Sequence, residues 1–343
     1  MADEARGTAA GAGQVPAFIG DRIRAAYGDE AAARILGGYR AACGRPVTLR
    51  ANTLKASAGE VASALEAAGI AYARVPWYKD AFVLEGVRER AVWDLPVYKE
   101  GKVYLQSLSS MLPPLALEPV EGADVLDMCA APGGKTAQIA ALTQGRAHLT
   151  ACELSAPRAE KLSYNLAKLG AGAVNIMRFD ARRLDEFFSF DQILLDAPCT
   201  GTGTVRAGDP HADRITDRLL AKVTRSQRAL LDRALTVLKP GGTLVYSTCS
   251  ILPQENGDQV AAALARHRGC GVVPIGLVGA AAARPEADAA SGGDGSPAPW
   301  TLPYAAEGDF AIPTLGGNVA GTLTVAPTGL YEGFFLARIQ KMA

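Results

Sequence analysis

The sequence predicts an α/β fold in which a doubly wound, mostly parallel β-sheet follows a small α+β module. Two observations lead to this prediction. From about residue 118 onward, apolar β-rich runs alternate with runs of helical spacing, which is typical of a doubly wound sheet. Several of these runs, such as ILLDAP and TLVYST, are almost continuously apolar, as expected of strands buried on both faces. Because the carboxyl ends of such strands carry the ligand, we expect the functional residues there.

Three regions are expected along the chain. Residues 1–45 should form a mobile N-terminus and a helical lead-in, because AFIGDRIRAAYGDEAAARILGGYRAA has helical spacing. Residues 46–117 should form the small α+β module, with strands at VTLRANTL, FVLEG and KVYLQ, a helix at GEVASALEAAGI and a final helix. Residues 118–343 should form the sheet domain, with strands at ADVLDMCA, AHLTACEL, AVNIMRF, DQILLDAP, GGTLVYST and GFFLARIQ. The Ala/Gly/Pro-rich stretch 269–321 should be an irregular insertion.

Composition restricts the class of protein. With 343 residues, 49% of them hydrophobic and 20% charged, the chain can bury a large core. No apolar run approaches the roughly 20 residues of a membrane span, and the first residues lack a secretory signal, so we expect a soluble cytoplasmic monomer without membrane contact. Lysine plus arginine equals aspartate plus glutamate, at 35 each, so any nucleic-acid surface must be a local patch.

Cysteine and histidine spacing argues against disulfides and metals. The six cysteines are scattered without a CxxC pair and are interpreted as free thiols: Cys43, Cys129, Cys152, Cys199, Cys249 and Cys270. His148 and His211 have no partner at ligand spacing, and His267 with Cys270 lacks further ligands. We therefore predict no metal site.

A glycine-rich turn, DMCAAPGGKT, follows the first strand of the sheet domain and leads into a helix. Glycines allow the backbone to approach a ligand closely, and the helix start offers free amides, so the turn should hold a nucleotide-like cofactor. The turn residues assigned to this cofactor are Cys129, Ala130, Ala131, Pro132, Gly133, Gly134 and Lys135. A phosphate-binding loop is disfavoured because Cys129 stands where its first glycine is required.

Acidic residues follow the next two strands. Glu153 lies where doubly wound folds place an acid on the ribose hydroxyls, and Asp180 would then lie beside the adenine. The alternative is that Asp127, Glu153 and Asp180 only cap turns after strands. That alternative weakens because all three follow successive strands.

Two cysteines also follow strands. Cys199 lies in DAPCTG and Cys249 in STCS, each at a predicted carboxyl end. A thiolate that adds to carbon-6 of cytosine makes carbon-5 reactive toward a methyl donor, and Asp196 could hold the exocyclic amine and ring nitrogen 3. Either cysteine taken singly could be a small buried hydrophobe, and the residues do not decide which thiol attacks.

The motifs DMCAAPGGKT, DAPCTGTG, YSTCSILPQEN, LRANTLK and GFFLARIQK resemble the Nop/Sun family of RNA cytosine-5 methyltransferases. The resemblance spans most of the chain and implies a Rossmann-like catalytic domain that binds S-adenosylmethionine, preceded by an RNA-recognition-like module. It implies that Cys249 is the nucleophile and that Cys199 assists product release. Lys135, Glu153, Arg158 and Asp180 would contact or frame the cofactor, while Asp196 would face both the base and the cofactor. The sequence departs from the family after DAPCTGTG, where it continues VRAGDPHADRITDR.

The expected substrate is RNA, with 16S ribosomal RNA favoured by similarity of PWY (76–78) to bacterial small-subunit members. Transfer RNA, DNA or a protein nitrogen as acceptor, and a non-catalytic assembly factor, remain alternatives. A flipped or unpaired cytosine could stack on Trp77 or Tyr78, or these aromatics could be core residues. Expected phosphate contacts come from Arg45, Arg50, Lys55, Lys99, Lys102, Arg206, Arg214, Arg218, Arg225 and Arg228.

Overall fold

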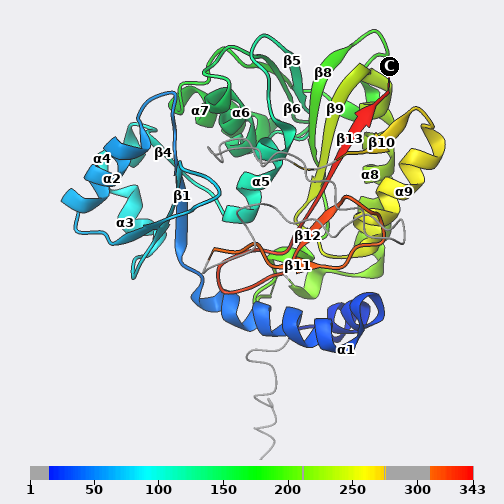
Figure 1. Cartoon of the computed structure of the whole chain (residues 1–343), viewed down its shortest axis with the longest axis horizontal. Helices are drawn as coiled ribbons and strands as arrows, with labels where there is room; N and C mark the ends of the chain where they lie inside the picture. The colour runs from blue at the N-terminus through cyan, green and yellow to red at the C-terminus, as the bar shows by residue number, and fades with distance from the viewer. Residues whose placement is uncertain (1–14, 211, 274, 276–309, 343) are drawn as a thin grey trace, which may run out of the picture.

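The computed structural model describes residues 15–210, 212–273, 275 and 310–342, and within them the chain forms two β-sheets (Figure 1). A four-stranded antiparallel sheet has the order β2-β3-β1-β4, and a nine-stranded mixed sheet has the order β11-β12-β13-β9-β8-β5-β6-β7, with β10 paired to β13. The predicted α/β class with a leading α+β module is confirmed. Most of the predicted insertion 269–321, and most of the expected mobile N-terminus, lie outside the described residues.

The leading module carries the smaller sheet. Its strands are β1 (Val47–Ala51), β2 (Tyr72–Arg74), β3 (Ala81–Leu84) and β4 (Val103–Leu105), and its helices are α2 (Ala58–Ala67), α3 (Glu89–Trp93) and α4 (Pro96–Lys99). The start of α2 is fixed by a capping box, in which Ser57 and Glu60 each bind the other's backbone amide. Apolar side chains of α2 and of the sheet, including Leu49, Val61 and Phe82, form a separate small core.

The larger sheet carries the remaining elements. Its strands are β5 (Asp124–Asp127), β6 (His148–Cys152), β7 (Asn175–Met177), β8 (Phe190–Asp196), β9 (Leu238–Thr248), β10 (Cys270–Val272), β11 (Thr314–Leu315), β12 (Leu323–Val325) and β13 (Phe334–Lys341). The helices around it are α1 (Ala17–Ala41), α5 (Leu108–Leu117), α6 (Gly134–Leu142), α7 (Ala156–Lys168), α8 (Asp217–Val237) and α9 (Gly257–Arg266). Short 3₁₀ turns are η1 (Ala42–Gly44), η2 (Ala181–Arg183), η3 (Thr202–Thr204), η4 (Ala212–Arg214) and η5 (Pro253–Glu255).

The strands that lead into the glycine-rich turn, the predicted cofactor acids and the two cysteine loops are parallel. β5 pairs with β6 and β8, β6 with β7, and β8 with β9, all in parallel register. The last predicted strand, β13, instead runs antiparallel to β9, and β10, β11 and β12 extend that antiparallel part. The sheet is therefore mixed, with a parallel part that brings the motif-bearing strand ends to one edge.

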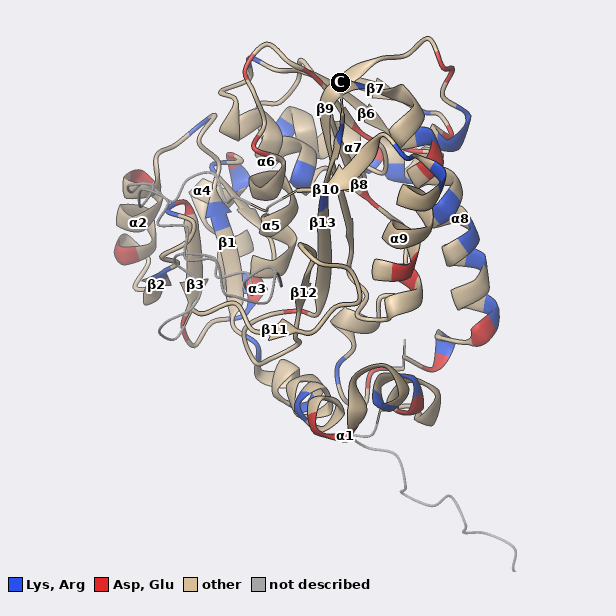
Figure 2. Cartoon of the chain, turned by 45° about the vertical axis from the view of Figure 1, so that its right-hand side comes forward, with Lys and Arg blue, Asp and Glu red and all other residues tan. Residues whose placement is uncertain are grey.

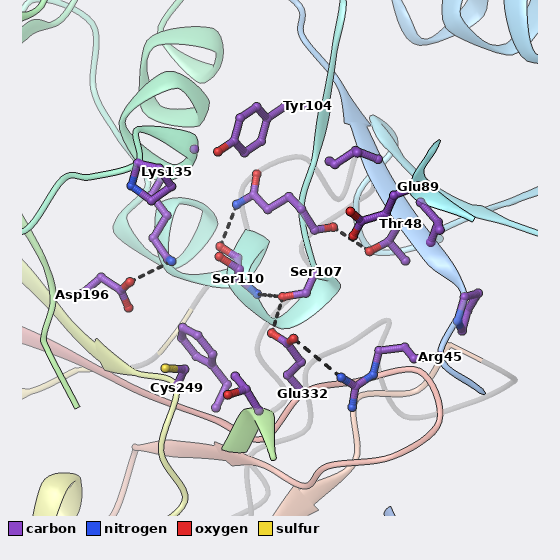
Figure 3. A pocket seen from close by; sticks show the side chains of 18 of the residues that line it. Arg45, Thr48, Glu89, Tyr104, Ser107, Ser110, Lys135, Asp196, Cys249 and Glu332 are labelled. Atoms are coloured by element: carbon purple, nitrogen blue, oxygen red, sulfur yellow. Dashed lines mark hydrogen bonds and ion pairs between the residues drawn. The ribbon is translucent and has the colours of Figure 1, made fainter. Parts of the chain in front are cut away.

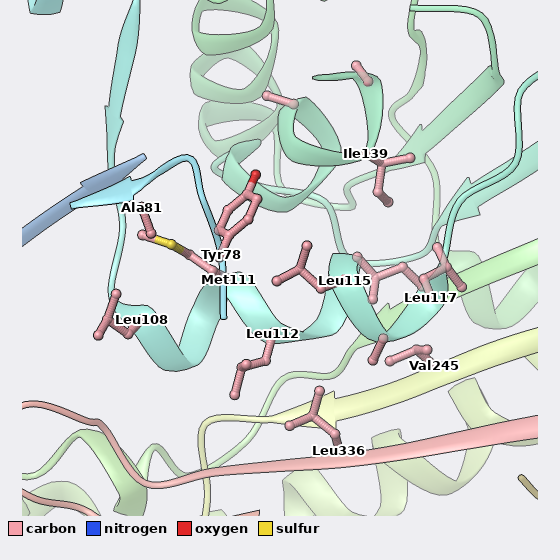
Figure 4. Close-up of a cluster of buried hydrophobic side chains, with 14 of the residues drawn as sticks. Tyr78, Ala81, Leu108, Met111, Leu112, Leu115, Leu117, Ile139, Val245 and Leu336 are labelled. Atoms are coloured by element: carbon pink, nitrogen blue, oxygen red, sulfur yellow. The ribbon is translucent and has the colours of Figure 1, made fainter. Parts of the chain in front are cut away.

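Helix α5 joins the two sheets (Figure 4). It begins at the N-cap Ser107, whose hydroxyl accepts a hydrogen bond from the Ser110 amide. Its apolar residues pack into one buried cluster with Tyr78 of the leading module and with Val245 and Leu336 of the larger sheet. Although α5 falls within the stretch 46–117 assigned to the module, it thus contributes to the core of the sheet domain.

The predicted helical lead-in is α1, and it is interrupted. Gly28 has φ +75°, a left-handed conformation that glycine adopts readily, and it divides α1 into two segments. Ile19, Ile35 and Tyr39 from the two segments pack against Val205 and other residues of the sheet domain. In Figure 1, α1 lies along the underside of the molecule, below β11 and β12.

Candidate active site

The predicted site residues meet at the carboxyl edge of the parallel strands. Asp196 at the end of β8 is directly paired with Ser247 of β9, so the loops that carry Cys199 and Cys249 leave neighbouring strands side by side. β5, next to β8, ends at Asp127, where the glycine-rich turn begins. The topology therefore brings together motifs that are separated by more than a hundred residues.

The glycine-rich turn has the backbone geometry that its sequence predicts. Gly133 caps α6 with φ +107°, which favours glycine. A Cβ on Gly134 would lie 2.5 Å from the Tyr104 ring, so only glycine lets β4 pack this closely on the turn. Behind the turn, the buried Asp127 carboxylate accepts a hydrogen bond of 2.7 Å from Thr136, and burial raises the Asp127 pKa to about 6.

A cavity of about 220 Å³ contains the predicted cofactor acids. Its lining includes Glu153 and Asp180, which follow β6 and β7, together with Cys129 of the turn. Glu153 is almost completely buried; it accepts a hydrogen bond from the Ser155 amide and pairs with Arg158 at 3.1 Å. Arg158 also donates to the carbonyl of Ala131 and so connects this acid to the glycine-rich turn.

The Asp180 carboxylate is held by its neighbour Arg182. Both of its oxygens accept hydrogen bonds from the Arg182 guanidinium, at 2.8 and 2.7 Å, and these bonds lower the Asp180 pKa. Phe179 and Leu230 add apolar surface to the same cavity. Two carboxylates beside an apolar wall suit a ligand that has both hydroxyl groups and an aromatic ring.

A larger cavity of about 760 Å³ lies between the leading module and the sheet domain (Figure 3). Its lining includes Cys249, Lys135 and Asp196, together with turn residues 129–132 and Gly134. Cys129 lines both cavities, so the two are neighbours across the turn. Cys199 lines neither of them.

Asp196 and Lys135 form an ion pair in this cavity. The lysine Nζ lies 2.8 Å from Asp196 Oδ2 (Figure 3). Ser247 donates to Asp196 Oδ1 at 2.8 Å. Burial lowers the Lys135 pKa, but the charge of Asp196 and its hydrogen bond raise it, and the net pKa is raised. Lys135 therefore stays a cation, and it also interacts electrostatically with Cys249.

The sulfur atoms of Cys199 and Cys249 lie 3.1 Å apart. The hydrogen bond to Cys249 and burial together raise the pKa of the Cys199 thiol well above its usual range. Cys199 therefore retains its proton and can donate it toward the Cys249 sulfur. This arrangement places a proton donor, the Cys199 thiol, and a cation, Lys135, beside the Cys249 sulfur.

Glu255 is a residue of this region to which sequence reasoning gave no role. Its fully buried carboxylate accepts hydrogen bonds from the Thr200 amide (2.7 Å), the Thr200 hydroxyl (2.5 Å), the Ser250 hydroxyl (2.5 Å) and the Gln227 amide (3.3 Å). Thr200 follows Cys199 and Ser250 follows Cys249, so one side chain ties both cysteine loops together. The only signal in the sequence was an acid six residues after Cys249 in YSTCSILPQEN.

Helix α1 donates hydrogen bonds to the loops that carry the two cysteines. The Tyr39 hydroxyl donates to the Thr202 carbonyl at 2.6 Å, and the Tyr27 hydroxyl donates to the Ile251 carbonyl. Thr202 and Ile251 lie within three residues of the two cysteines. Sequence reasoning described α1 only as a lead-in, because a helical pattern does not reveal what its polar side chains contact.

Several expected RNA contacts are corrected by the structure. Trp77 and Tyr78 are core residues, 1% and 2% exposed, so the stacking interpretation is wrong and the core alternative is confirmed. Arg50 is also wrong as a phosphate contact: it is fully buried and donates to Gln106 and to the Gly134 carbonyl. The Arg45 side chain is 6% exposed and pairs with Glu332, although it does line the larger cavity.

The expected basic residues of α8 lie away from both cavities. Figure 2 shows Lys and Arg along α8, on the side opposite the leading module. Arg218, Arg225 and Arg228 of α8 are exposed and line neither cavity, whereas Arg206 does line the larger one. Among the described residues, no helix could cross a membrane, and no three His, Cys, Asp or Glu side chains are grouped to hold a metal ion.

Comparison with known proteins places the chain in a family. Residues 114–340 match the model described as 16S rRNA methyltransferase RsmB/F, and residues 15–89 match the ferredoxin-like domain of the RsmF/B-like methyltransferases. A relative from Shewanella oneidensis, "Ribosomal RNA small subunit methyltransferase F", is 40% identical over 226 residues, covering 64% of this chain and 47% of its own. The same-named protein of Shewanella loihica is 40% identical, with 63% and 46% covered. The chain thus spans about half the length of these curated relatives.

Solved structures agree with this assignment. A methyltransferase homolog protein from Pyrococcus horikoshii is 33% identical, with a TM-score of 0.72 and 94% of both chains covered. NSun6 from Pyrococcus horikoshii with SFG has the same fold, with 22% identity, a TM-score of 0.76, and 96% of this chain and 98% of its own covered. The matched family models and the similar proteins show that the chain belongs to the 16S rRNA methyltransferase RsmB/F family.

Proposed function

We propose that this protein transfers a methyl group from S-adenosylmethionine to carbon-5 of a cytosine in RNA, with 16S ribosomal RNA as the favoured substrate. One observation carries the proposal: the Cys249 sulfur lines a cavity beside a Lys135–Asp196 ion pair and the glycine-rich turn. The preference for ribosomal over transfer RNA is supported by the family description and by the relatives' names. The proposed cofactor residues are those of the turn together with Glu153, Arg158, Asp180 and Asp196.

The smaller cavity fits an adenosine group. Glu153 would accept hydrogen bonds from ribose hydroxyls, and Asp180 would accept one from the adenine amino group. The bound cofactor would supply an electrophilic methyl group. Because Cys129 lines both cavities, a ligand anchored beside Glu153 can extend past the turn toward Lys135 and Asp196.

The chain's own residues perform the remaining chemistry in this proposal. The Cys249 thiolate forms a bond to carbon-6, and the ring electrons make carbon-5 nucleophilic toward the methyl group. Ser247 and Lys135 each use one lone pair on a different oxygen of Asp196, so each oxygen keeps a free lone pair. Asp196 can therefore hold the exocyclic amine and nitrogen 3, which takes a proton from water as the thiolate adds and returns it to water when the product forms. A base then removes the carbon-5 proton, and the carbon–sulfur bond breaks to restore the thiolate.

Cys199 is proposed to assist the release step. Its protonated sulfur lies 3.1 Å from the Cys249 sulfur, which is the leaving group in elimination. Loss of Cys199 should therefore impair resolution more than attack.

The test compares single cysteine variants with radiolabelled S-adenosylmethionine and small-subunit ribosomal RNA. Cys249→Ala should reduce methylcytosine formation by at least about a thousandfold, because the ring is never activated. Cys199→Ala should accumulate a protein–RNA adduct that survives denaturing electrophoresis. Cys270→Ala, a free thiol on β10, is the matched control and should behave as wild type.

The contrary outcomes are distinct. Near-normal methylation by Cys249→Ala would disprove the nucleophile assignment, and an adduct in that variant would exchange the two roles. The alternative of a non-catalytic assembly factor predicts that Cys249→Ala fully restores ribosome maturation in cells lacking the gene. Methylation of transfer RNA in preference to ribosomal RNA would overturn only the choice of substrate.

A further inference from the structure

A third cavity, of about 290 Å³, adjoins the larger one. The two share Glu89, Tyr104, Leu105 and Pro132 in their linings, so the groove continues from the Cys249 cavity over the glycine-rich turn. One wall comes from helices α3 and α4 of the leading module, and the other comes from α7 of the sheet domain. Nothing in the proposed reaction at Cys249 uses this groove.

The module wall is aromatic. Trp93, the last residue of α3, is 46% exposed, whereas the other module tryptophan, Trp77, is buried. Tyr98 of α4 lines the same groove, and the ammonium of Lys168 lies 3.9 Å from the centroid of its ring. An exposed indole at the wall of a groove offers a flat face on which a nucleobase can stack.

The opposite wall is basic and polar. Lys161, Asn165 and Lys168 line the groove at positions i, i+4 and i+7 of α7, which places them on one face of that helix. The Lys168 ammonium lies over the Tyr98 ring and Lys161 lies two turns away on the same helix, so two cations lie beside an aromatic wall. Such a surface is complementary to a stacked base with its phosphate. In a chain with 35 basic and 35 acidic residues, such local placement matters more than net charge.

We propose that this groove binds a nucleotide next to the target cytosine in a single-stranded segment of the RNA substrate, with its base stacked on Trp93 and its phosphate beside Lys161 and Lys168. This proposal rests on the proposed function, because the target cytosine must occupy the adjoining Cys249 cavity. A flipped or unpaired base leaves its neighbours unstacked, and an aromatic platform replaces that lost stacking. The groove thus binds the strand without reading its sequence.

Affinity for RNA provides the test. The probe is a fluorescein-labelled single-stranded RNA of about twelve nucleotides with one central cytosine, titrated by anisotropy. Trp93→Leu should weaken binding roughly tenfold through loss of stacking, and Trp93→Tyr should restore most of the affinity. Lys161→Gln should weaken binding less and reduce its salt dependence. The matched control is Phe187→Leu, at a 90% exposed aromatic that precedes the amino end of β8, whereas the site lies at the carboxyl ends of the strands. This variant should bind as wild type.

A second probe locates the stacked base. An abasic site on one side of the cytosine should weaken binding to the wild type but have no further effect on Trp93→Leu. The proposal that this groove binds a nucleotide would be wrong if Trp93→Leu and wild type bound the RNA equally well. It would also be wrong if the abasic site and the substitution weakened binding independently and additively. Methyl transfer to ribosomal RNA by the wild type is measured in parallel. Transfer without any effect of Trp93→Leu on affinity would contradict the groove alone, whereas no transfer at all would contradict the proposed function.

Discussion

Glu255 shows how a single buried carboxylate can set the geometry of the two loops that carry Cys199 and Cys249. Its two oxygens receive four donors, so every acceptor position of the carboxylate is filled. The Ser250 hydroxyl donates to Glu255 and accepts from the Leu252 amide, and it is also paired with Thr202. The direction of these hydrogen bonds therefore depends on an acceptor at position 255.

Glu255→Gln should disrupt these hydrogen bonds and so displace the sulfur atoms of Cys199 and Cys249 relative to each other. The amide of glutamine donates where the carboxylate accepted, so the Thr200 and Ser250 hydroxyls lose their acceptor. We expect single-turnover adduct formation to slow by about 10- to 100-fold, since small displacements of reacting groups have effects of this size. S-adenosylmethionine affinity, measured by calorimetry, should be unchanged because the proposed cofactor residues do not contact Glu255.

The control for this prediction is Glu160→Gln, at an exposed position on α7. A Glu255→Gln protein with normal adduct kinetics would show that the carboxylate does not position the cysteines. Equal loss of cofactor affinity and adduct formation would indicate general damage to the fold instead.

The two cysteines and Glu255 differ in how far the sequence reveals them. A thiol directly after an apolar run can be placed at a strand end, and parallel strands align such ends, so the meeting of Cys199 and Cys249 was predictable in outline. The importance of Glu255 depends on donors from Thr200 and Gln227, which lie in other elements. No local pattern shows that a carboxylate will be buried among them. The same limit left open whether Trp77 stacks on a base or belongs to the core.

At the scale of elements, α1 depends on close contact with the chain segment before β13. A Cβ on Gly38 would lie 1.8 Å from the Pro327 carbonyl oxygen, so the helix backbone packs directly against that segment. Among the described residues outside the helix backbone, only the flexible end of Arg40 lies within 4 Å of a Cβ position on the neighbouring Gly37. These adjacent helical glycines therefore differ in their surroundings rather than in their conformation.

Alanine at the two positions should change stability in opposite directions. Gly38→Ala should lower the free energy of unfolding by about 1–3 kcal/mol, because α1 must move away from Pro327. Gly37→Ala should raise it by up to about 1 kcal/mol, because alanine loses less backbone entropy in a helix. Urea titration followed by circular dichroism measures both, and destabilisation of similar size in the two variants would contradict close packing at Gly38.

Element type was more predictable than element direction. GFFLARIQ was expected as a strand from its apolar run and forms β13, but its antiparallel pairing with β9 depends on the path of the preceding chain. The interruption of α1 at Gly28 was likewise not evident, because an isolated glycine within a helical pattern is often tolerated.

For the whole molecule, the position of the leading module determines both the larger cavity and the groove. Asn52, in the LRANTLK motif after β1, donates from one amide to the Gly101 carbonyl of the module (2.8 Å) and to the Leu169 carbonyl of the sheet domain (2.7 Å). Lys55 donates to the Lys168 carbonyl beside it. This motif therefore fastens the module to the end of α7.

Replacing Asn52 with leucine should separate cofactor binding from RNA binding. The similar volume of leucine preserves packing, but the two carbonyls lose their donor, at a cost of roughly 1–3 kcal/mol each. The module should then unfold or undock at a lower urea concentration than the sheet domain, which would split one transition into two. S-adenosylmethionine affinity should persist because the described residues that line the proposed adenosine cavity all belong to the sheet domain. RNA affinity should fall because the module no longer holds its position. The control Asn175→Leu, at an exposed asparagine of β7, should alter neither S-adenosylmethionine affinity nor RNA affinity. A parallel loss of both affinities in Asn52→Leu would show that the glycine-rich turn itself depends on the module.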